Sequence, residues 1–289
     1  MVPEGFVEIR AEKKRIYVKR AFAFLSEYLT GTAYPWTQRR RTDAHTPAYQ
    51  GRGQLYILDL RPRMHERAVI KHYQRGGLFR FLFRDLYCQT RRFFRELHVV
   101  ERARALGIPT AEILALVVDR SGFFFYRADL VTMEIPESMN LADYLDTLPK
   151  AEEHPDCRVT RQQILVMVSS LLRKMHHAGI YHADLNLKNI LVKKIGDTIE
   201  GYIIDLDRAR YQPLLKYSQR VDNLLRLYRS LEKMGYVSSA ITQEDLHTFV
   251  ELYCDGEPEL AERCRMLLIR SPFSLRVHRF FWRITGKKR

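Results

Sequence analysis

The sequence predicts an α+β protein with two lobes, a small β-rich N-terminal lobe over about residues 1–130 and a larger helical C-terminal lobe over about residues 131–289. Segments with strand-like alternation dominate before residue 130, and segments with helical spacing of apolar residues dominate after it. The character of the chain changes once, and no internal repeat or low-complexity linker divides it. We therefore expect a single domain of 289 residues that contains both lobes.

The composition indicates a globular protein with an anionic partner. Of the 289 residues, 46% are hydrophobic, and 48 Lys and Arg against 34 Asp and Glu give a net charge of +14. No run of about 18 apolar residues predicts a membrane-spanning helix, and the charged start lacks the apolar centre of a signal peptide. The chain has no CxxC pair, and its widely spaced cysteines predict reduced thiols: Cys88, Cys157, Cys254 and Cys264.

The N-terminal lobe is expected to contain four strands and one helix. Residues 51–60 open with glycines and then alternate, and residues 66–73 carry a short apolar run that ends in a lysine. Residues 85–106 have helical spacing, and a glycine and a proline follow them. Two further strands within 111–131 are joined at a serine and a glycine. Residues 1–50 are basic and mixed in character, and we assign no element to them.

Helices dominate the C-terminal lobe. Residues 140–148 form the first, with Asn140 as its N-cap, and residues 161–179 form a long helix with an apolar face. His176 and His177 stand at the end of that helix, where histidine commonly interacts with the helix dipole. The lobe is also expected to contain a helix at 219–234 and a short strand pair within 199–210.

One stretch of this lobe, "YHADLNLKNILV" at residues 181–192, is either an amphipathic strand or a loop that supports phosphoryl transfer. Phosphoryl transfer needs a carboxylate near the acceptor hydroxyl, oxygen ligands for Mg²⁺ and a cation on the nucleotide phosphates. Asp184 supplies the first of these, and the amide of Asn189 can face a metal. Asp205 follows an apolar run, which suits a rigidly held metal ligand.

Four features in order give the chain a resemblance to the protein kinases. "HADLNLKN" resembles the catalytic loop H-R-D-x-x-x-x-N, with Ala183 in place of the arginine, and "DLD" at 205–207 stands where D-F-G is expected. "AVIK", ending at Lys71, resembles the V-A-I-K strand, and Glu96 falls where its helix-borne partner is expected. The resemblance implies a bilobal protein-kinase-like fold.

The same resemblance implies roles for individual residues and two cofactors, ATP and Mg²⁺. Asp184, Lys71 and Glu96 are the expected catalytic residues, and Asn189 and Asp205 are the expected metal ligands. His182 is expected to brace the metal-binding segment rather than to transfer a proton. The residues expected to contact the nucleotide are Lys71 and the two glycines of the short "GRG" stretch, Gly51 and Gly53.

Two departures from the protein-kinase pattern favour a small molecule or glycolipid as acceptor. Ala183 removes the arginine that, in many protein kinases, pairs with a phosphorylated activation loop. The segment after Asp205 runs almost at once into the next helix, and it contains no A-P-E sequence. Little chain is therefore left from which a peptide-docking platform could be built.

Further stretches resemble a narrower family, the bacterial lipopolysaccharide-core kinases, above all those that act on 3-deoxy-D-manno-octulosonic acid (Kdo). They are "IKHYQRGGLF" (70–79), "FFYRADLVT" (124–132), "GIYHADLNLKNIL" (179–191) and "NLLRLYRSLEKM" (223–234). The resemblance covers about residues 50–234. Asp207 agrees with this family, whereas its members commonly carry Arg at the position of Lys71. The resemblance to this family implies ATP-dependent phosphorylation of a Kdo hydroxyl on a lipid A precursor, by analogy at the 4-position. It also implies that the reaction takes place at the cytoplasmic face of the inner membrane.

Basic clusters agree with a peripheral protein on an anionic membrane. Residues 275–289 interleave three aromatic residues with Arg and Lys, a composition suited to a membrane surface. A second cluster of arginines follows Lys71 and forms either one basic rim or scattered surface charges: Arg75, Arg80, Arg84, Arg91 and Arg92. No zinc-finger, RRM or KH pattern accompanies the charge, so nucleic acid is not an expected partner. The expected partners are a glycolipid acceptor and the membrane, with no obligate protein partner.

Three alternatives remain open on the sequence. A heptose kinase of the same core pathway would share the catalytic frame. A pseudokinase or membrane-docked scaffold would keep the fold without turnover, although the presence of Lys71, Asp184, Asn189 and Asp205 together disfavours it. A small-molecule or antibiotic kinase would leave the basic, aromatic C-terminal segment unexplained.

Overall fold

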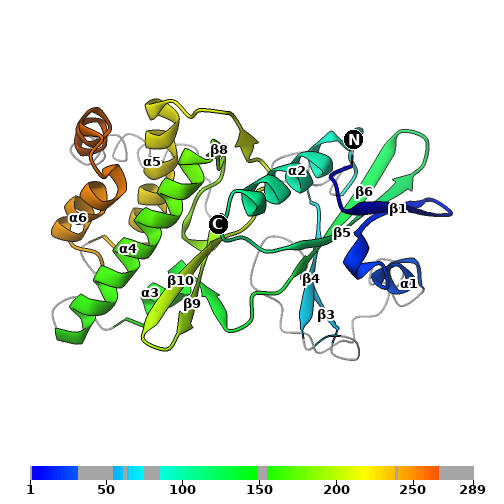
Figure 1. Ribbon diagram of the computed structural model, residues 1–289, viewed down its shortest axis with the longest axis horizontal. Helices are drawn as coiled ribbons and strands as arrows, with labels where there is room; N and C mark the ends of the chain where they lie inside the picture. Colours follow the sequence, from blue (N-terminus) through cyan, green and yellow to red (C-terminus); the bar gives the residue numbers. More distant parts are fainter. Residues whose placement is uncertain are drawn as a thin grey trace, which may run out of the picture. The chain divides into compact units, whose positions relative to one another are not determined.

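A computed structural model describes residues 2–31, 55–60, 64, 66–74, 85–148, 155–237 and 240–266 (Figure 1). The chain divides into two compact units. Unit 1 comprises Met1–Pro136 together with Asp205–Arg208, and unit 2 comprises Glu137–Ile204 and Ala209–Arg289. Four residues of the later sequence therefore belong with the N-terminal unit.

Unit 1 contains an antiparallel sheet of six strands in the order β1-β2-β5-β6-β4-β3. The β5–β6 hairpin lies at its centre, and β4 pairs with β6 so that Lys71 lies opposite Leu130. The strands β1 and β2 form a hairpin within the segment to which the sequence analysis assigned no element. The strands are β1 (Phe6–Ala11), β2 (Lys14–Lys19), β3 (Leu55–Asp59), β4 (Arg67–His72), β5 (Ile113–Ser121) and β6 (Phe125–Met133).

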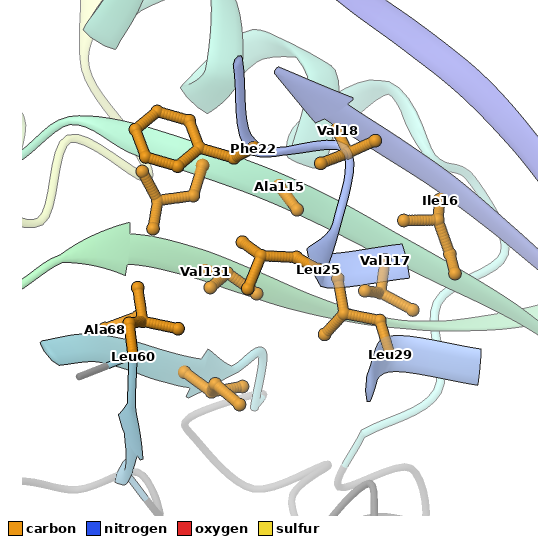
Figure 2. Close-up of a cluster of buried hydrophobic side chains, with 12 residues drawn as sticks. Ile16, Val18, Phe22, Leu25, Leu29, Leu60, Ala68, Ala115, Val117 and Val131 are labelled. Carbon is orange, nitrogen blue, oxygen red and sulfur yellow. The ribbon is translucent and has the colours of Figure 1, made fainter. Parts of the chain in front are cut away.

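A short helical segment covers one face of this sheet. The 3-10 turn η1 (Arg20–Phe22) and the helix α1 (Leu25–Thr30) follow β2 directly. Figure 2 shows Leu25 and Leu29 of α1 directed toward Val117 and Val131 of the central strands. Ala68 and Ile70 of β4 belong to the same buried cluster. Because side chains alternate along a strand, Lys71 points to the other face.

The helix α2 (Arg91–Ala105) packs against β5 and places Glu96 among its buried residues. Its apolar residues Phe93, Leu97 and Val100 are also buried. The helix begins at Arg91 and not near residue 85 as the spacing predicted. Tyr87 instead exchanges two backbone hydrogen bonds with Tyr126 of β6, at 2.9 and 2.8 Å, so a tertiary contact replaces the first turns of the expected helix.

Unit 2 is mainly helical (Figure 1). Its longest helix packs against α6 and against β10, where Gly201 lets the strand approach Met167 closely. Asn140 caps α3, because its side-chain oxygen accepts a hydrogen bond from the Asp143 N–H, as predicted. In the part of the chain that the structure describes, no helix is long and apolar enough to cross a bilayer. The helices are α3 (Leu141–Asp146), α4 (Pro155–His177), α5 (Tyr217–Met234), α6 (Gln243–Cys254) and one at 258–266.

Two small sheets complete unit 2 and flank the stretch 181–192. The strands β8 (Ile180–Tyr181) and β11 (Arg210–Tyr211) pair with each other, and a three-stranded sheet has the order β10-β9-β7. Its strands are β7 (Ser138–Asn140), β9 (Ile190–Ile195) and β10 (Thr198–Ile203). The prediction of a strand pair within residues 199–210 is wrong, because β10 pairs with the preceding strand β9 through a turn at Gly196. The stretch 181–192 is thus a loop that runs into a strand.

We predict that Gly179→Ala strongly destabilises unit 2. Gly179 has a φ of +74°, and a Cβ atom there would lie 1.7 Å from the backbone oxygen of Gln212, with which Gly179 pairs. We expect a loss of about 3–5 kcal/mol in the free energy of unfolding, measured by urea denaturation.

Gly196→Ala is the matched control for this change. Gly196 also has a positive φ, +57°, but a Cβ atom there meets nothing within 4 Å. It should cost only the left-handed backbone strain of about 1–2 kcal/mol. Equal losses for the two variants would contradict the close approach of β8 and β11.

Candidate active site

Unit 1 brings three of the predicted site residues together, with Glu96 and Asp205 around the Lys71 ammonium. Lys71 Nζ donates to Glu96 Oε1 at 2.7 Å and to Asp205 Oδ1 at 3.0 Å. Lys71 comes from β4 and Glu96 from α2, whereas Asp205 belongs to the four-residue segment that joins unit 1 from later in the chain. Glu96 lies 25 positions after Lys71 in the sequence, and Asp205 lies 134 positions after it. The fold therefore brings distant parts of the chain together at one cation.

The charge state of this group follows from burial and pairing. Burial alone would lower the pKa of the Lys71 ammonium, but attraction to Glu96 and Asp205 outweighs it and raises that pKa. Burial raises the pKa of Glu96, and Lys71 opposes this effect. The second oxygen of Glu96 accepts a hydrogen bond from the Tyr73 hydroxyl at 2.5 Å. Sequence reasoning missed Tyr73, although it lies two residues after Lys71 and hence on the same side of the strand.

Asp205 and Asp207 are held in a fixed local conformation. Asp205 has a φ of +59°, a left-handed conformation that aspartate adopts more readily than most residues. Leu206 is buried, and Asp207 forms a two-pronged ion pair with Arg92 of α2, whose Nε donates to Oδ1 at 2.6 Å. The pair raises the pKa of Arg92.

Of the five arginines predicted to form a basic rim, the structure describes two, Arg91 and Arg92. Because Arg92 is committed to Asp207, it does not serve as a free rim cation. Arg91 is exposed. Arg75, Arg80 and Arg84 lie outside the described residues, as do the two predicted nucleotide-contacting glycines, Gly51 and Gly53.

Unit 2 holds the other predicted residues in one loop between β8 and β9. The side-chain amide N–H groups of Asn186 and Asn189 both donate to the backbone oxygen of Asp184, each at 2.8 Å. The loop includes the 3-10 turn η3 (Leu187–Asn189), which Asn186 caps through the Lys188 N–H. Asp184 is exposed, and its carboxylate has no partner among the described residues. The loop thus presents a free carboxylate on a rigid backbone.

His182 connects this loop to the residue just before Asp205. Its Nε2 lies 3.1 Å from the Ile204 carbonyl oxygen, and its Nδ1 accepts from the Asp184 N–H at 3.2 Å. Nε2 therefore carries the proton and donates to Ile204. Both ring nitrogens of His182 therefore contact the backbone, and one of these contacts braces the residue that precedes Asp205.

A network of buried polar side chains contacts the backbone of the loop at His182. Asn223 of α5 accepts from the His182 N–H at 3.0 Å and donates to the His182 carbonyl at 2.9 Å. His176 Nε2 lies 3.1 Å from the same Asn223 oxygen, and His176 Nδ1 lies 2.7 Å from the Tyr253 hydroxyl. Arg220 donates to that hydroxyl at 2.9 Å. The polar residues at 220 and 223 interrupt the buried face of α5, which is the sequence signal that could have identified them.

The expectation that His176 caps the helix dipole is wrong. His176 is buried and bonded to two neutral side chains, and burial lowers its pKa to about 3. It is therefore neutral at pH 7 and bridges Tyr253 to Asn223. His177, its neighbour, is half-exposed and lies 3.5 Å from Glu257.

The chemistry of the predicted metal ligands fits Mg²⁺. Asp205 supplies a carboxylate, and the Asn189 amide oxygen is left as an acceptor because its N–H group is turned to Asp184. Both are hard oxygen donors of the kind that Mg²⁺ prefers. In the described ranges, no group of three or more His, Cys, Asp and Glu side chains forms a metal cluster of its own.

The sheet with its Lys–Glu pair and the helical unit with its H-x-D-x-x-x-x-N loop define a kinase-like phosphotransferase. The fold is similar to that of the solved structure "WaaP in complex with acyl carrier protein", with a TM-score of 0.50 and 19% identity over 77% of this chain and 87% of that one. Residues 46–253 match the sequence profile of the lipopolysaccharide kinase (Kdo/WaaP) family. The chain belongs to this family, whose members are phosphotransferases with an alcohol group as acceptor.

Curated relatives agree with this assignment. A "3-deoxy-D-manno-octulosonic acid kinase" from Pasteurella multocida is 32% identical over 190 residues, which is 64% of this chain and 73% of the relative. A protein of the same name from Vibrio cholerae is 32% identical over 63% of this chain and 72% of its own length. Another from Haemophilus influenzae is 28% identical over 71% of this chain and 82% of its own length. The predicted fold class, family and enzyme class are confirmed, and the roles of the individual site residues stay predictions.

We predict that Glu96→Gln lowers phosphoryl transfer about 100-fold, because it removes the buried anion that orients Lys71. The measurement is the transfer rate at saturating ATP. The control is Glu134→Gln, which breaks an ion pair of similar length with Arg67, 2.6 Å, elsewhere in unit 1. The control should keep the parent rate. A parent rate for Glu96→Gln would show that Lys71 needs no orienting partner.

We predict a pH dependence of stability from His176. Its folded-state pKa lies below the unfolded value of about 6.5, so the unfolded chain binds more protons and stability falls as the pH drops from about 6.5 toward 3. Between pH 7 and pH 5 the loss should be about 2 kcal/mol, measured by urea unfolding. His176→Gln should remove this part of the slope, whereas His177→Gln should leave it. An unchanged slope in His176→Gln would contradict a buried neutral imidazole.

Proposed function

We propose that the protein transfers the γ-phosphoryl group of ATP to a hydroxyl of Kdo, the 4-position by analogy, on a lipid A precursor. The observation that carries the proposal is the convergence of Glu96 and Asp205 on the Lys71 ammonium, in a chain whose loop also presents an exposed Asp184 carboxylate. The names of the curated relatives support Kdo as the acceptor sugar. We propose that residues 1–289 act as one kinase-like domain.

Each residue then has a defined task. Lys71 binds the nucleotide phosphates together with Gly51 and Gly53, and Glu96 keeps the ammonium in place. Asp184 orients the acceptor hydroxyl and accepts its proton on a carboxylate oxygen. Asp205 and Asn189 hold Mg²⁺, which when bound neutralises negative charge on the phosphates.

A polar cavity of unit 2 supports an acidic sugar over a neutral one. The cavity has a volume of about 250 Å³ and adjoins the start of the loop at Tyr181. Arg210 on its wall has no ion-pair partner among the described residues, whereas Asp222 is bonded to Tyr181 and to Arg226. A guanidinium can bind the carboxylate of Kdo, and a heptose has no such group. The remaining lining residues are Gln212, Ser218 and Gln219.

We propose that the protein acts at the cytoplasmic face of the inner membrane as a peripheral enzyme. The net charge of +14 and the basic, aromatic composition of residues 275–289 support this location. That segment lies outside the described residues, so its role rests on composition.

The decisive experiment measures phosphate transfer from labelled ATP to a Kdo-containing lipid A precursor and, in parallel, to a heptosylated acceptor. We expect transfer to the Kdo acceptor and a reduction of about 10²- to 10⁴-fold in Asp184→Asn. Transfer to the heptosylated acceptor alone would favour a heptose kinase. Transfer at the parent rate by Asp184→Asn would refute the catalytic assignment, and no transfer to any acceptor by the parent chain would favour a pseudokinase.

We predict that deletion of residues 275–289 weakens co-sedimentation with anionic vesicles at physiological salt, because the segment carries both basic and aromatic side chains. Transfer to a water-soluble Kdo acceptor should stay at the parent rate. Unchanged sedimentation of the shortened protein would remove the membrane role of this segment.

A further inference from the structure

The turn between β5 and β6 exposes two adjacent phenylalanines. The exposed fractions of Phe123 and Phe124 are 83% and 78%. Among the large hydrophobic residues that the structure describes, only Leu214 is as exposed as Phe123. Gly122, with a φ of +77°, forms the tight turn that directs them outward. Single exposed apolar residues are normal, whereas here two neighbouring phenylalanines place their apolar surface together at one turn. We call Phe123 and Phe124 the phenylalanine tip.

Two backbone carbonyl groups of the turn that carries the phenylalanine tip have a hydrogen-bond donor within the protein. Arg120 Nε donates to the Gly122 carbonyl at 3.2 Å, and its Nη2 donates to the Phe123 carbonyl at 3.4 Å. Carbonyl groups that leave water without a hydrogen-bond partner cost several kcal/mol in hydrocarbon. Arg120 therefore reduces the cost of moving this turn out of bulk water, and it places a positive charge at the backbone of the turn.

A second hairpin brings further positive charge to the same end of the sheet. The β1–β2 turn lies beside the β5–β6 turn, since Lys14 pairs with Asp119 and the Arg120 N–H donates to the Lys13 carbonyl at 3.0 Å (Figure 1). Residues 8–15 and 119–127 together contain six basic and three acidic residues, a net charge of +3. Lys13 and Arg15 are exposed, and neither has an ion-pair partner in the described ranges.

We propose that the phenylalanine tip inserts into the boundary between headgroups and acyl chains of an anionic bilayer, with Lys13, Arg15 and Arg120 facing the lipid phosphates. Apolar rings in front of a basic rim are the composition of an interfacial anchor. A turn of two exposed phenylalanines offers far less area than a stable protein interface buries, whereas insertion into a bilayer needs no matching surface. The tip belongs to unit 1 and is separate from residues 275–289.

The test places a tryptophan at the tip of the full-length chain. Phe124→Trp is mixed with vesicles of phosphatidylglycerol and phosphatidylethanolamine that contain no glycolipid, with and without brominated acyl chains. The parent protein gives the background of Trp36 and Trp282. Leu214→Trp is the matched control, because Leu214 is 83% exposed and lies in unit 2. We expect a blue shift and bromine quenching above background at position 124 and neither at position 214.

The absence of added quenching at position 124 in protein that sediments with the vesicles would overturn the proposal. Equal quenching at 124 and 214 would overturn it as well, because the contact would not be specific to the tip. As a second measurement, Phe123→Ser with Phe124→Ser should lower the partition coefficient at least about tenfold, and Leu214→Ser should not.

The same variants separate this proposal from the proposed function. The double serine variant should phosphorylate a water-soluble Kdo acceptor at the parent rate, because the tip carries none of the proposed catalytic residues. Unchanged partitioning of this variant would refute membrane insertion and leave phosphoryl transfer standing. Replacement of Lys13 and Arg15 by alanine should weaken binding to the anionic vesicles and leave binding to phosphatidylcholine vesicles unchanged.

Discussion

The structure of unit 1 depends on one buried carboxylate, that of Glu96. A charged group removed from water is stable only when its lone pairs find partners, and Glu96 finds two in Lys71 and Tyr73 of the neighbouring strand region. These bonds set the rotation of α2 against β4, because both partners lie on the face of the sheet opposite to α1. Once Lys71 is fixed in this way, Asp205 has a cation to approach.

The second charged contact of α2 extends the same arrangement. Arg92 lies one turn before Glu96 on the helix and holds Asp207, while Lys71 holds Asp205. The two aspartates are thus tied to unit 1 by one cation each. Both aspartates are therefore linked to α2, Asp207 directly through Arg92 and Asp205 through Lys71 and Glu96.

In unit 2, the groups that contact the loop directly are neutral, and the charged Arg220 is reached only through Tyr253. The side chain of Asn223 satisfies both backbone groups of His182, and a neutral His176 supports Asn223 from the other side. Neutral partners avoid the cost of burying charge, and their directional bonds still specify one conformation. The result is a loop whose backbone is fixed while the Asp184 carboxylate is left free.

Local patterns were sufficient for part of this structure and not for the rest. The strand with Lys71, the cap at Asn140 and the loop that contains Asp184 and Asn189 could be predicted because local sequence patterns mark them. The start of α2 could not, because a backbone pairing between Tyr87 and Tyr126 decides it. The role of His176 could not either, since its partner Asn223 lies 47 residues away and turns a candidate cation into a neutral bridge.

The order in which the chain contributes to the two units has a consequence for how the protein can be divided. Residues Asp205–Arg208 leave unit 2 after Ile204 and return to it at Ala209, in addition to the passage after Pro136. A fragment that ends at residue 136 would contain Lys71 and Arg92 but neither aspartate that pairs with them. No single cut point separates the two units, so replacement of the N-terminal unit of this chain by a related one would also require replacement of Asp205–Arg208.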